Sequence, residues 1–212
     1  MRSPSSQKIP GNRGKIKACV RAIRRGGVVI FPTETVYALA CDSSNKKTLR
    51  KLCKLKGRDR KKPMQLLLGD FADLGRYARL DAIPQDILRA LAKLWPGPLT
   101  AVLPATSAGR AISGRSSIGV RMPAHRLALS ILKNAGVPVA ATSANLSGGA
   151  EPVSFALIPK ELKNTAQYVL RAPRVTRYAK ASTVVDLTGP RPKLLRQGSV
   201  SMAKITRTIY SR

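Results

Sequence analysis

Two short polar clusters contain the side chains best suited to chemistry. One is Lys-Gly-Arg at residues 56–58, followed by Lys-Lys-Pro at 61–63, and the other is Thr-Ser-Ala-Asn-Leu-Ser-Gly-Gly at 142–149. Arginine binds phosphate oxygens in a bidentate manner, and lysine acts on them as a point charge. Hydroxyls, an amide and glycine backbone N–H groups can cradle a phosphate or a ribose. Together the two clusters could form a pocket for a phosphorylated substrate.

Each cluster also has a purely structural explanation. Cations at the end of a helix complement its dipole, and basic helical faces are usually just solvated. Gly57 is expected to end that helix and to turn Arg58 away from its axis. The run 142–149 could equally be an Asx- or Ser-type turn, and it contains neither a Walker A sequence nor a G-x-G-x-x-G. The local sequence alone leaves both interpretations open.

A third candidate is the Pro-Thr-Glu-Thr segment at residues 32–35, which directly follows the apolar run 28–31. Ligands of open α/β sheets collect beyond strand ends, so Thr33 and Thr35 could hydrogen-bond a small polar substrate. A capped turn with solvated side chains explains the segment equally well.

Histidine and cysteine chemistry has little support in this chain. His125 is the sole histidine, and we expect it to be a surface or helix-capping residue. Cys19, Cys41 and Cys53 are odd in number and lack C-x-x-C spacing, so we expect buried free thiols in a reducing compartment. No metal site is predicted from these residues.

The spacing of apolar residues predicts helices that alternate with strands, and these elements must position the clusters. The expected helices cover residues 15–25, 46–56, 84–95 and 124–135. The expected strands cover residues 28–31, 65–68, 99–103, 118–121, 137–141, 167–171, 183–187 and 193–195. This alternation favours an α/β (α+β-like) domain with a mixed sheet over a sandwich.

Length and charge limit the remaining possibilities. The 212 residues, 43% of them hydrophobic, suit a single domain at 14–198, with a flexible basic arm at 1–13 and a C-terminal tail at 199–212. Lysine and arginine number 39 against 10 acidic residues, a net charge of +29, which attracts polyanions such as RNA. A membrane surface would also attract this charge, but the sequence has no basic amphipathic helix with a bulky aromatic face, so RNA is the better partner. We expect a cytoplasmic protein, although the acid-poor start also fits an organelle transit peptide.

Taken in order along the chain, the motifs resemble the YrdC/TsaC family of L-threonylcarbamoyladenylate synthases. The resemblance covers about residues 15–198 and is specific as an ordered set, whereas no single piece is specific. The matching pieces are Gly27-x-x-x-Phe31-Pro32-Thr33-Glu34-Thr35-Val36-Tyr37, Lys56-Gly57-Arg58 with Lys62-Pro63, Trp95-Pro96-Gly97-Pro98-Leu99-Thr100, Val120-Arg121-x-Pro123, Ser143-Ala144-Asn145-x-Ser147-Gly148, Ser182-Thr183-Val184 and Leu195-Arg196-x-Gly198.

The resemblance implies a single domain with a strongly twisted mixed sheet and a large positively charged concave face. It implies that L-threonine, bicarbonate or CO2, and ATP with Mg²⁺ are joined into threonylcarbamoyl-AMP and pyrophosphate. That product would feed threonylcarbamoyladenosine formation in tRNA through downstream transfer proteins. Implied catalytic residues are Lys56 and Arg58. Implied ATP contacts are Lys56, Arg58, Lys62, Ser117, Ser143, Asn145 and Arg196. Implied threonine contacts are Thr35, Arg121, Ala141 (through its backbone) and Ser182.

The sequence departs from the family pattern at two positions. Some members carry a histidine where this chain has Leu66-Leu67, and some place a serine on ATP where this chain has Glu151, whose carboxylate would repel phosphate. The extra C-terminal domain of the long form is missing, so we expect the short form. We also expect direct RNA contact through residues 46–62 and the N-terminal arm.

Two alternative functions stay open: a non-enzymatic double-stranded RNA or ribosome-binding protein of the same fold, and carbamoyl transfer to another acceptor.

Overall fold

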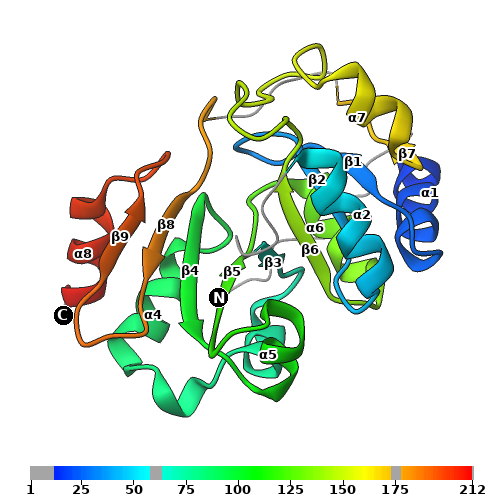
Figure 1. The fold of residues 1–212 in the computed structure, drawn as a ribbon. Coiled ribbons are helices and arrows are strands. Elements are labelled where there is room, and N and C mark those ends of the chain that lie inside the picture. The colour runs from blue at the N-terminus through cyan, green and yellow to red at the C-terminus, as the bar shows by residue number, and fades with distance from the viewer. Residues whose placement is uncertain (1–11, 58–63, 173–177, 212) are drawn as a thin grey trace.

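The computed structural model describes residues 12–57, 64–172 and 178–211 (Figure 1). Most of the arm predicted at 1–13 therefore lies outside the described residues. The helices of the described part are α1 (Arg13–Arg24), α2 (Lys46–Lys56), α3 (Leu74–Tyr77), α4 (Gln85–Leu94), α5 (Ser107–Ser113), α6 (Arg126–Ala135), α7 (Lys160–Thr165) and α8 (Met202–Tyr210), with short 3-10 helices at Phe71–Asp73 and Leu80–Ala82. None of these helices is long and apolar enough to cross a membrane.

The strands described by the structure form one mixed sheet. They are β1 (Val29–Phe31), β2 (Ala38–Asp42), β3 (Gln65–Leu67), β4 (Leu99–Pro104), β5 (Ser117–Arg121), β6 (Val139–Ser143), β7 (Tyr168–Val169), β8 (Thr183–Asp186) and β9 (Lys193–Arg196). Their order across the sheet is β7-β1-β2-β6-β3-β5-β4-β8-β9. The pairs β1–β7, β3–β5 and β4–β8 are parallel, and the others are antiparallel. The expected single domain with a mixed sheet and packed helices is confirmed.

The two halves of the sheet are covered differently. Around β1 and β2 both faces are buried, because α1 and α6 pack on one face and α2 and α7 on the other. Around β4, β5 and β8 the helices α4 and α8 pack on one face only. The residues buried under α4 and α8 alternate along the strands with residues that belong to no hydrophobic cluster of the described chain. In this half of the sheet, α4 and α8 leave the opposite face uncovered, so polar side chains can lie there.

Helix α4 and its end illustrate how local sequence builds the covered face. Ile87, Ala90 and Leu91 recur at helical spacing and are buried, so they form the stripe that faces the sheet. The helix stops before Trp95, whose indole Nε1 donates a hydrogen bond to the carbonyl of Leu99 at 2.8 Å. The corner at residues 95–98 therefore anchors Trp95 in the core, where the residue is 5% exposed.

Two elements differ from the sequence prediction near the second polar cluster. Strand β2 was not predicted, because alanine and aspartate, which make up three of its five residues, are depleted in strands. Its place is set by pairing with β1 and β6 on its two sides. Strand β6 lies two residues later than the strand predicted at 137–141. Thr142 and Ser143 consequently belong to the strand and not to the turn that follows it.

The C-terminal segment is more structured than its sequence suggested. Residues 199–212 were predicted as a tail, yet they contain α8, whose Ile205 and Ile209 are buried in the cluster beneath β4 and β8. Helix α8 packs against α4 at the end of the molecule opposite α1 (Figure 1).

Candidate active site

Lys56 joins the two polar clusters in space. It is the last residue of α2, which is capped at its start by the Asn45 side chain and at its end by Gly57 in the left-handed conformation, φ 61°. Although charged, Lys56 is only 4% exposed. Its Nζ donates hydrogen bonds to the carbonyl and Oγ of Ser143, at 2.6 and 3.1 Å, and to the carbonyl and Oδ1 of Asn145, at 3.0 and 2.7 Å.

The second cluster is held in one conformation by its own hydrogen bonds. Ser143 Oγ donates to Asn145 Oδ1 at 2.7 Å, and Asn145 Nδ2 donates to the Gly149 carbonyl at 2.7 Å. The backbone N–H of Ser147 donates to the carbonyl of Lys56 at 2.9 Å. An ammonium group has three N–H donors and this one already lies near four oxygens, so a phosphate contact would replace one of them. The predicted residues Arg58 and Lys62 lie outside the described residues.

A second centre surrounds Arg121 at the end of β5. Its Nη2 donates to Glu34 Oε1 and to Thr35 Oγ1, both at 2.8 Å, and its Nε donates to the Gly97 carbonyl at 3.3 Å. Arg121 and Glu34 form an ion pair whose side chains are each 3% exposed. The segment 32–35 is therefore a structured, buried turn and not a solvated one.

A row of polar side chains crosses from β3 to β9. Thr100 Oγ1 donates to Gln65 Oε1 at 2.7 Å and lies 2.8 Å from Ser182 Oγ. Because Thr100 has spent its single proton on Gln65, Ser182 must donate to Thr100. Arg196 in turn donates from Nη2 to the carbonyl and Oγ of Ser182, at 2.8 and 3.2 Å. This row orients the Ser182 hydroxyl and fixes the Arg196 guanidinium beside it.

The sheet register places these groups on the face that the helices leave uncovered. Side chains alternate along a strand, so Ser117, Gly119 and Arg121 share one face of β5, while Ile118 and Val120 point into the core. Thr100 lies opposite Val184, and Val184 lies opposite Arg196, on that same face. A Cβ built on Gly119 would meet nothing closer than the Thr100 methyl, at 3.7 Å. Because α4 and α8 cover only the other face of β4, β5 and β8, we call this side of the sheet the open face.

Some predicted positions gain no support from the geometry. Ala141 lies between β2 and β3 inside the ladder, so its backbone has no evident access to a ligand. Leu66 and Leu67, where some relatives have histidine, are core residues on opposite faces of β3. Glu151 Oε2 accepts a hydrogen bond from the Ala181 N–H at 2.7 Å, next to Ser182, so this carboxylate has a structural partner.

Three residues in these hydrogen-bond networks were not predicted as site residues: Glu34 beside Arg121, and Gln65 and Thr100 in the polar row. The signal for Gln65 and Thr100 was available, because each is the single polar residue of an otherwise apolar predicted strand. For Glu34 the sequence left a solvated turn residue open as one interpretation, and only the long-range contact with Arg121 shows that the residue is buried and paired.

His125 lies just beyond this centre as the N-cap of α6. Its Nδ1 accepts the Ala128 N–H at 3.4 Å, which confirms the predicted capping role. Burial lowers the pKa of His125 below 6.5, and the negative charge of Glu34 partly opposes that effect. A neutral imidazole is the form that can accept the capping hydrogen bond.

The residues predicted to contact threonine are enclosed. Thr35, Arg121 and Ser182 have exposures of 0%, 2% and 1%. A ligand in direct contact with them would require movement of the residues that cover them, as occurs when loops close over substrates.

This arrangement of motifs and sheet is shared with known proteins. A family model named for Sua5, YciO and YrdC, with the description "Telomere recombination", matches residues 21–198. The chain belongs to this family. Within it, the threonylcarbamoyl-AMP synthase of Pyrococcus abyssi is 34% identical over 197 residues, which make up 92% of this chain and 57% of the relative. A putative threonylcarbamoyl-AMP synthase of Mycobacterium tuberculosis is 32% identical, covering 93% of this chain and 90% of that protein.

A solved Sua5 structure has the same fold. The crystal structure of P. abyssi Sua5 complexed with L-threonine superimposes with a TM-score of 0.86 at 34% identity, covering 93% of this chain and 58% of that one. The chain therefore spans less than three fifths of the length of this Sua5 relative.

Proposed function

We propose that the protein makes L-threonylcarbamoyl-AMP from L-threonine, bicarbonate or CO2, and ATP, with release of pyrophosphate. The observation that carries this proposal is the meeting of Lys56 with Ser143 and Asn145, because it joins the two clusters that resembled a nucleotide site. The relatives named as threonylcarbamoyl-AMP synthases, and the Sua5 structure with L-threonine, support the choice of reaction. The product would serve threonylcarbamoyladenosine formation in tRNA through separate transfer proteins.

The reaction needs no covalent intermediate on the protein. The threonine amine captures CO2 as a carbamate, a carbamate oxygen attacks the α-phosphorus of ATP, and pyrophosphate leaves. Catalysis of this kind depends on positioning and on stabilising charge at the phosphates. Lys56 fixes Ser143 and Asn145 and adds positive charge, and Arg196 is the cation on the other side of the open face. The part assigned to Arg58 and Lys62 stays a prediction.

The amino acid would bind at the Arg121 centre. A guanidinium matches a carboxylate in shape and charge, so Arg121 would hold the threonine carboxylate, and the Thr35 and Ser182 hydroxyls would contact its amine or hydroxyl. Ser117, at the start of β5 on the same face, would reach the nucleotide.

Mg²⁺ is proposed to arrive on the ATP triphosphate. In the described part of the chain, no group of three or more histidine, cysteine, aspartate or glutamate side chains could hold a metal ion. Mg²⁺ commonly keeps its waters and binds through substrate phosphates, so such a cluster is not required. When bound, the ion would neutralise charge on the leaving pyrophosphate.

The test is an assay of pyrophosphate release with ATP, bicarbonate and single amino acids. Release that depends on L-threonine, with threonylcarbamoyl-AMP identified by mass spectrometry, is the expected result. Release that depends on another acceptor would indicate carbamoyl transfer to that acceptor. RNA binding without any turnover would indicate the non-enzymatic alternative.

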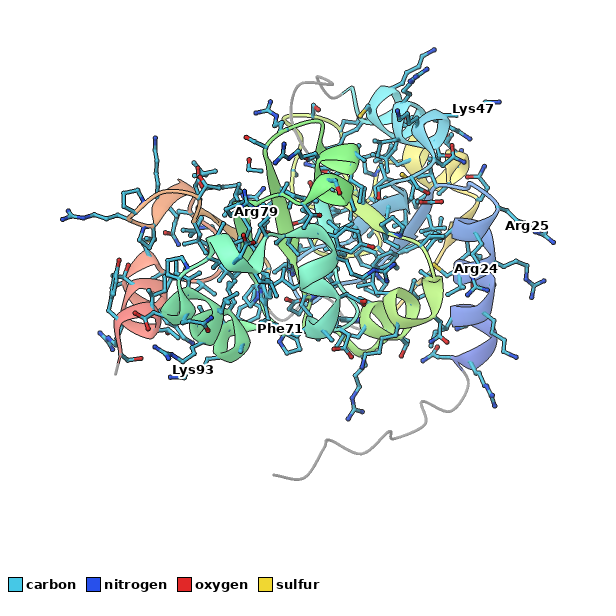
Figure 2. All side chains as sticks on the ribbon, turned by 90° about the horizontal axis from the view of Figure 1, so that it is seen from below. Arg24, Arg25, Lys47, Phe71, Arg79 and Lys93 are labelled. Atoms are coloured by element: carbon cyan, nitrogen blue, oxygen red, sulfur yellow. The ribbon has the colours of Figure 1, made fainter. Side chains whose placement is uncertain are left out.

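RNA contact is a second proposal, and it has its own observation. Helices α1 and α2 carry exposed cations and pack on opposite faces of the sheet. The segment just after α1 is linked to the first turn of α2, because Thr48 Oγ1 donates a hydrogen bond to the Gly26 carbonyl at 2.8 Å. We call these cations the basic surface: Arg13, Lys15, Lys17, Arg21, Arg24, Arg25, Lys46, Lys47, Arg50, Lys51 and Lys54. A groove of about 610 Å³ between α1 and α6 lies within it. Figure 2 shows Arg24, Arg25 and Lys47 at the same end of the molecule.

The basic surface favours a polyanion for two reasons. Within the described residues, none of its cations forms a salt bridge with an acidic side chain. The apolar residues of α1, such as Val20 and Ile23, are buried in the core and cannot insert into a lipid surface. Exposed cations that form no salt bridges with carboxylates are well suited to bind the phosphates of a nucleic acid.

A further inference from the structure

One buried oxygen beside Arg121 has no hydrogen-bond partner in the described residues. Glu34 is 4% exposed, and its Oε1 accepts from Arg121 at 2.8 Å, but its Oε2 accepts no hydrogen bond. Leaving a buried charged oxygen unpaired is costly, and such atoms are rare in folded proteins. An unpaired carboxylate oxygen next to a candidate amino-acid site suggests that a ligand supplies the missing donor.

The hydrogen-bond directions around Thr35 leave a second acceptor at the same place. Thr33 Oγ1 donates to the Val36 carbonyl at 2.6 Å, so the 2.9 Å contact between the two threonine hydroxyls must be donated by Thr35. Thr35 Oγ1 also accepts from Arg121 at 2.8 Å. Its proton is therefore used, and what remains is one lone pair that can only accept a hydrogen bond.

The unused hydrogen-bond donors at this centre belong to Arg121, and the unused acceptors belong to Glu34 and Thr35. Glu34 Oε1 and Thr35 Oγ1 lie side by side because both bond to Arg121 Nη2. The other terminal nitrogen, Nη1, makes no hydrogen bond within the described residues, so it can donate two. The ligand that fits has a carboxylate for Nη1 and an N–H group for Glu34 Oε2 and the Thr35 lone pair, which together describe an α-amino acid.

We propose that Glu34 is a substrate-binding residue whose Oε2 accepts a hydrogen bond from the amino group of the amino-acid substrate, while its Oε1 fixes Arg121. This inference rests on the proposed function and adds the group that would hold the reacting nitrogen. A hydrogen bond from N–H to the carboxylate holds the nitrogen in place and does not engage the lone pair of the free amine, which the reaction needs.

The first test is Glu34→Gln with two ligands. The amide carbonyl can still accept from Arg121, whereas the NH2 group takes the place of Oε2 and cannot accept from an amine. With ATP present, we expect L-threonine affinity to fall roughly 10- to 100-fold, the range for a lost hydrogen bond to a charged group. Affinity for (R)-3-hydroxybutyrate, which is threonine without its amino group, should not fall, because removing the negative charge beside Arg121 does not weaken its attraction for a carboxylate.

Two outcomes of this test would overturn the proposal. An equal loss for both ligands would mean that Glu34 acts only by holding Arg121. No loss for either would mean that water satisfies Oε2 in the free and bound states.

A second measurement on the unaltered protein covers the case in which the variant fails to fold. The chain has three glutamates, Glu34, Glu151 and Glu161, so labelling the glutamate carboxyl carbons with ¹³C gives three NMR signals. Glu151→Gln and Glu161→Gln identify two of them, and the third is Glu34. Saturation with L-threonine should move the Glu34 signal, whereas ATP alone should not. A Glu34 signal that ignores L-threonine would contradict the proposal.

The failure of this inference can be told apart from failure of the proposed function. If the unaltered protein with ATP does not bind L-threonine at all, the proposed function itself is wrong. If it binds and uses L-threonine while both Glu34 readouts stay flat, only the role of Glu34 is wrong.

Discussion

Lys56 shows how a single side chain can organise a site far from it in sequence. Its ammonium lies within hydrogen-bonding distance of four oxygens of Ser143 and Asn145, residues that are almost ninety positions further along the chain. Burying a cation is unfavourable unless oxygens surround it, so this contact constrains both partners. The same bonds that stabilise the run 142–149 therefore also set the positions of its hydroxyl and amide.

Lys56→Ala should lower both stability and activity. Removing the ammonium leaves buried carbonyl oxygens without their donor, which costs about 1–3 kcal/mol of unfolding free energy. Pyrophosphate release should fall much further, because Ser143 and Asn145 lose their common partner. Urea denaturation and the release assay measure the two effects. Lys54→Ala, an exposed neighbour on the same helix, is the control. Equal stability of the two variants would show that the buried contact contributes nothing.

His125 should make stability depend on pH. Its pKa in the folded protein lies below 6.5 because of burial, so the unfolded chain binds the proton more readily. Stability should therefore decrease as the pH falls through the unfolded value of 6.5 toward the lower folded value. His125→Asn keeps an N-cap side chain without a titrating ring. The unfolding temperature of the unaltered protein should fall more than that of the variant between about pH 8 and about pH 5. Parallel pH profiles would mean that His125 is not the group responsible.

At the scale of elements, α8 completes the core of the half-sheet that carries the open face. Ile205 is fully buried against the cluster that also contains Ile87 and Leu91 of α4. The helix thus packs behind β4 and β8, while Thr100 of β4 and Ser182, which immediately precedes β8, contact each other on the opposite face.

Ile205→Ala should destabilise the fold by about 2–5 kcal/mol, the usual cost of removing a fully buried isoleucine side chain. Lys204→Ala, its exposed neighbour, should stay within about 0.5 kcal/mol of the unaltered protein. Calorimetric or urea unfolding provides the comparison. If the two variants unfold alike, residues 199–212 behave as the tail that the sequence suggested.

An element could be predicted from the sequence when it was long and its apolar residues had regular spacing. Helices α1, α2, α4 and α6 have long apolar stripes and clear ends, and their sequences located them within about two residues. Strand β2 and helices α3, α5 and α7 are short or weakly patterned, so neighbouring elements decide their structure. Helix α8 does have Ile205 and Ile209 at helical spacing, so its sequence carried a signal that could have been used.

The candidate site likewise contains residues that the sequence could indicate and residues that it could not. The Ser143–Asn145 pair and Lys56 were recognisable because their types and order match a motif. Glu34, Gln65 and Thr100 were not, because their roles arise from contacts with Arg121 and Ser182, which only the folded sheet brings near.

The whole molecule separates two kinds of positive charge. Lys56, Arg121 and Arg196 are held by specific hydrogen bonds around the open face. The cations of the basic surface are exposed and lie over α1 and α2, and Arg24 among them also donates hydrogen bonds to the carbonyls of Ala135 and Asn134. An RNA bound there would approach the molecule from the side of these helices.

Lys47→Glu should weaken RNA binding more than Lys93→Glu. Both lysines are exposed, but Lys47 lies in the basic surface, whereas Lys93 on α4 lies at the opposite end of the molecule (Figure 2). Filter binding at increasing salt should give a steep loss of affinity, and Lys47→Glu should reduce that salt slope by about one or more, as expected for each lost phosphate contact. An affinity that is flat in salt, or identical effects of the two substitutions, would exclude this surface as the RNA contact.

The alternation along β5 restricts how such a chain can vary in length. Ile118 and Val120 fill the interior while Ser117, Gly119 and Arg121 form the opposite face. Deleting one residue here would move side chains to the opposite face of the sheet, so that Arg121 would point into the core or Ile118 and Val120 would point out of it. Stability and ligand binding would fail in the same step. Insertions or deletions in this strand should therefore be tolerated in pairs, or singly where a β-bulge restores the alternation, whereas surface connections can vary freely in length.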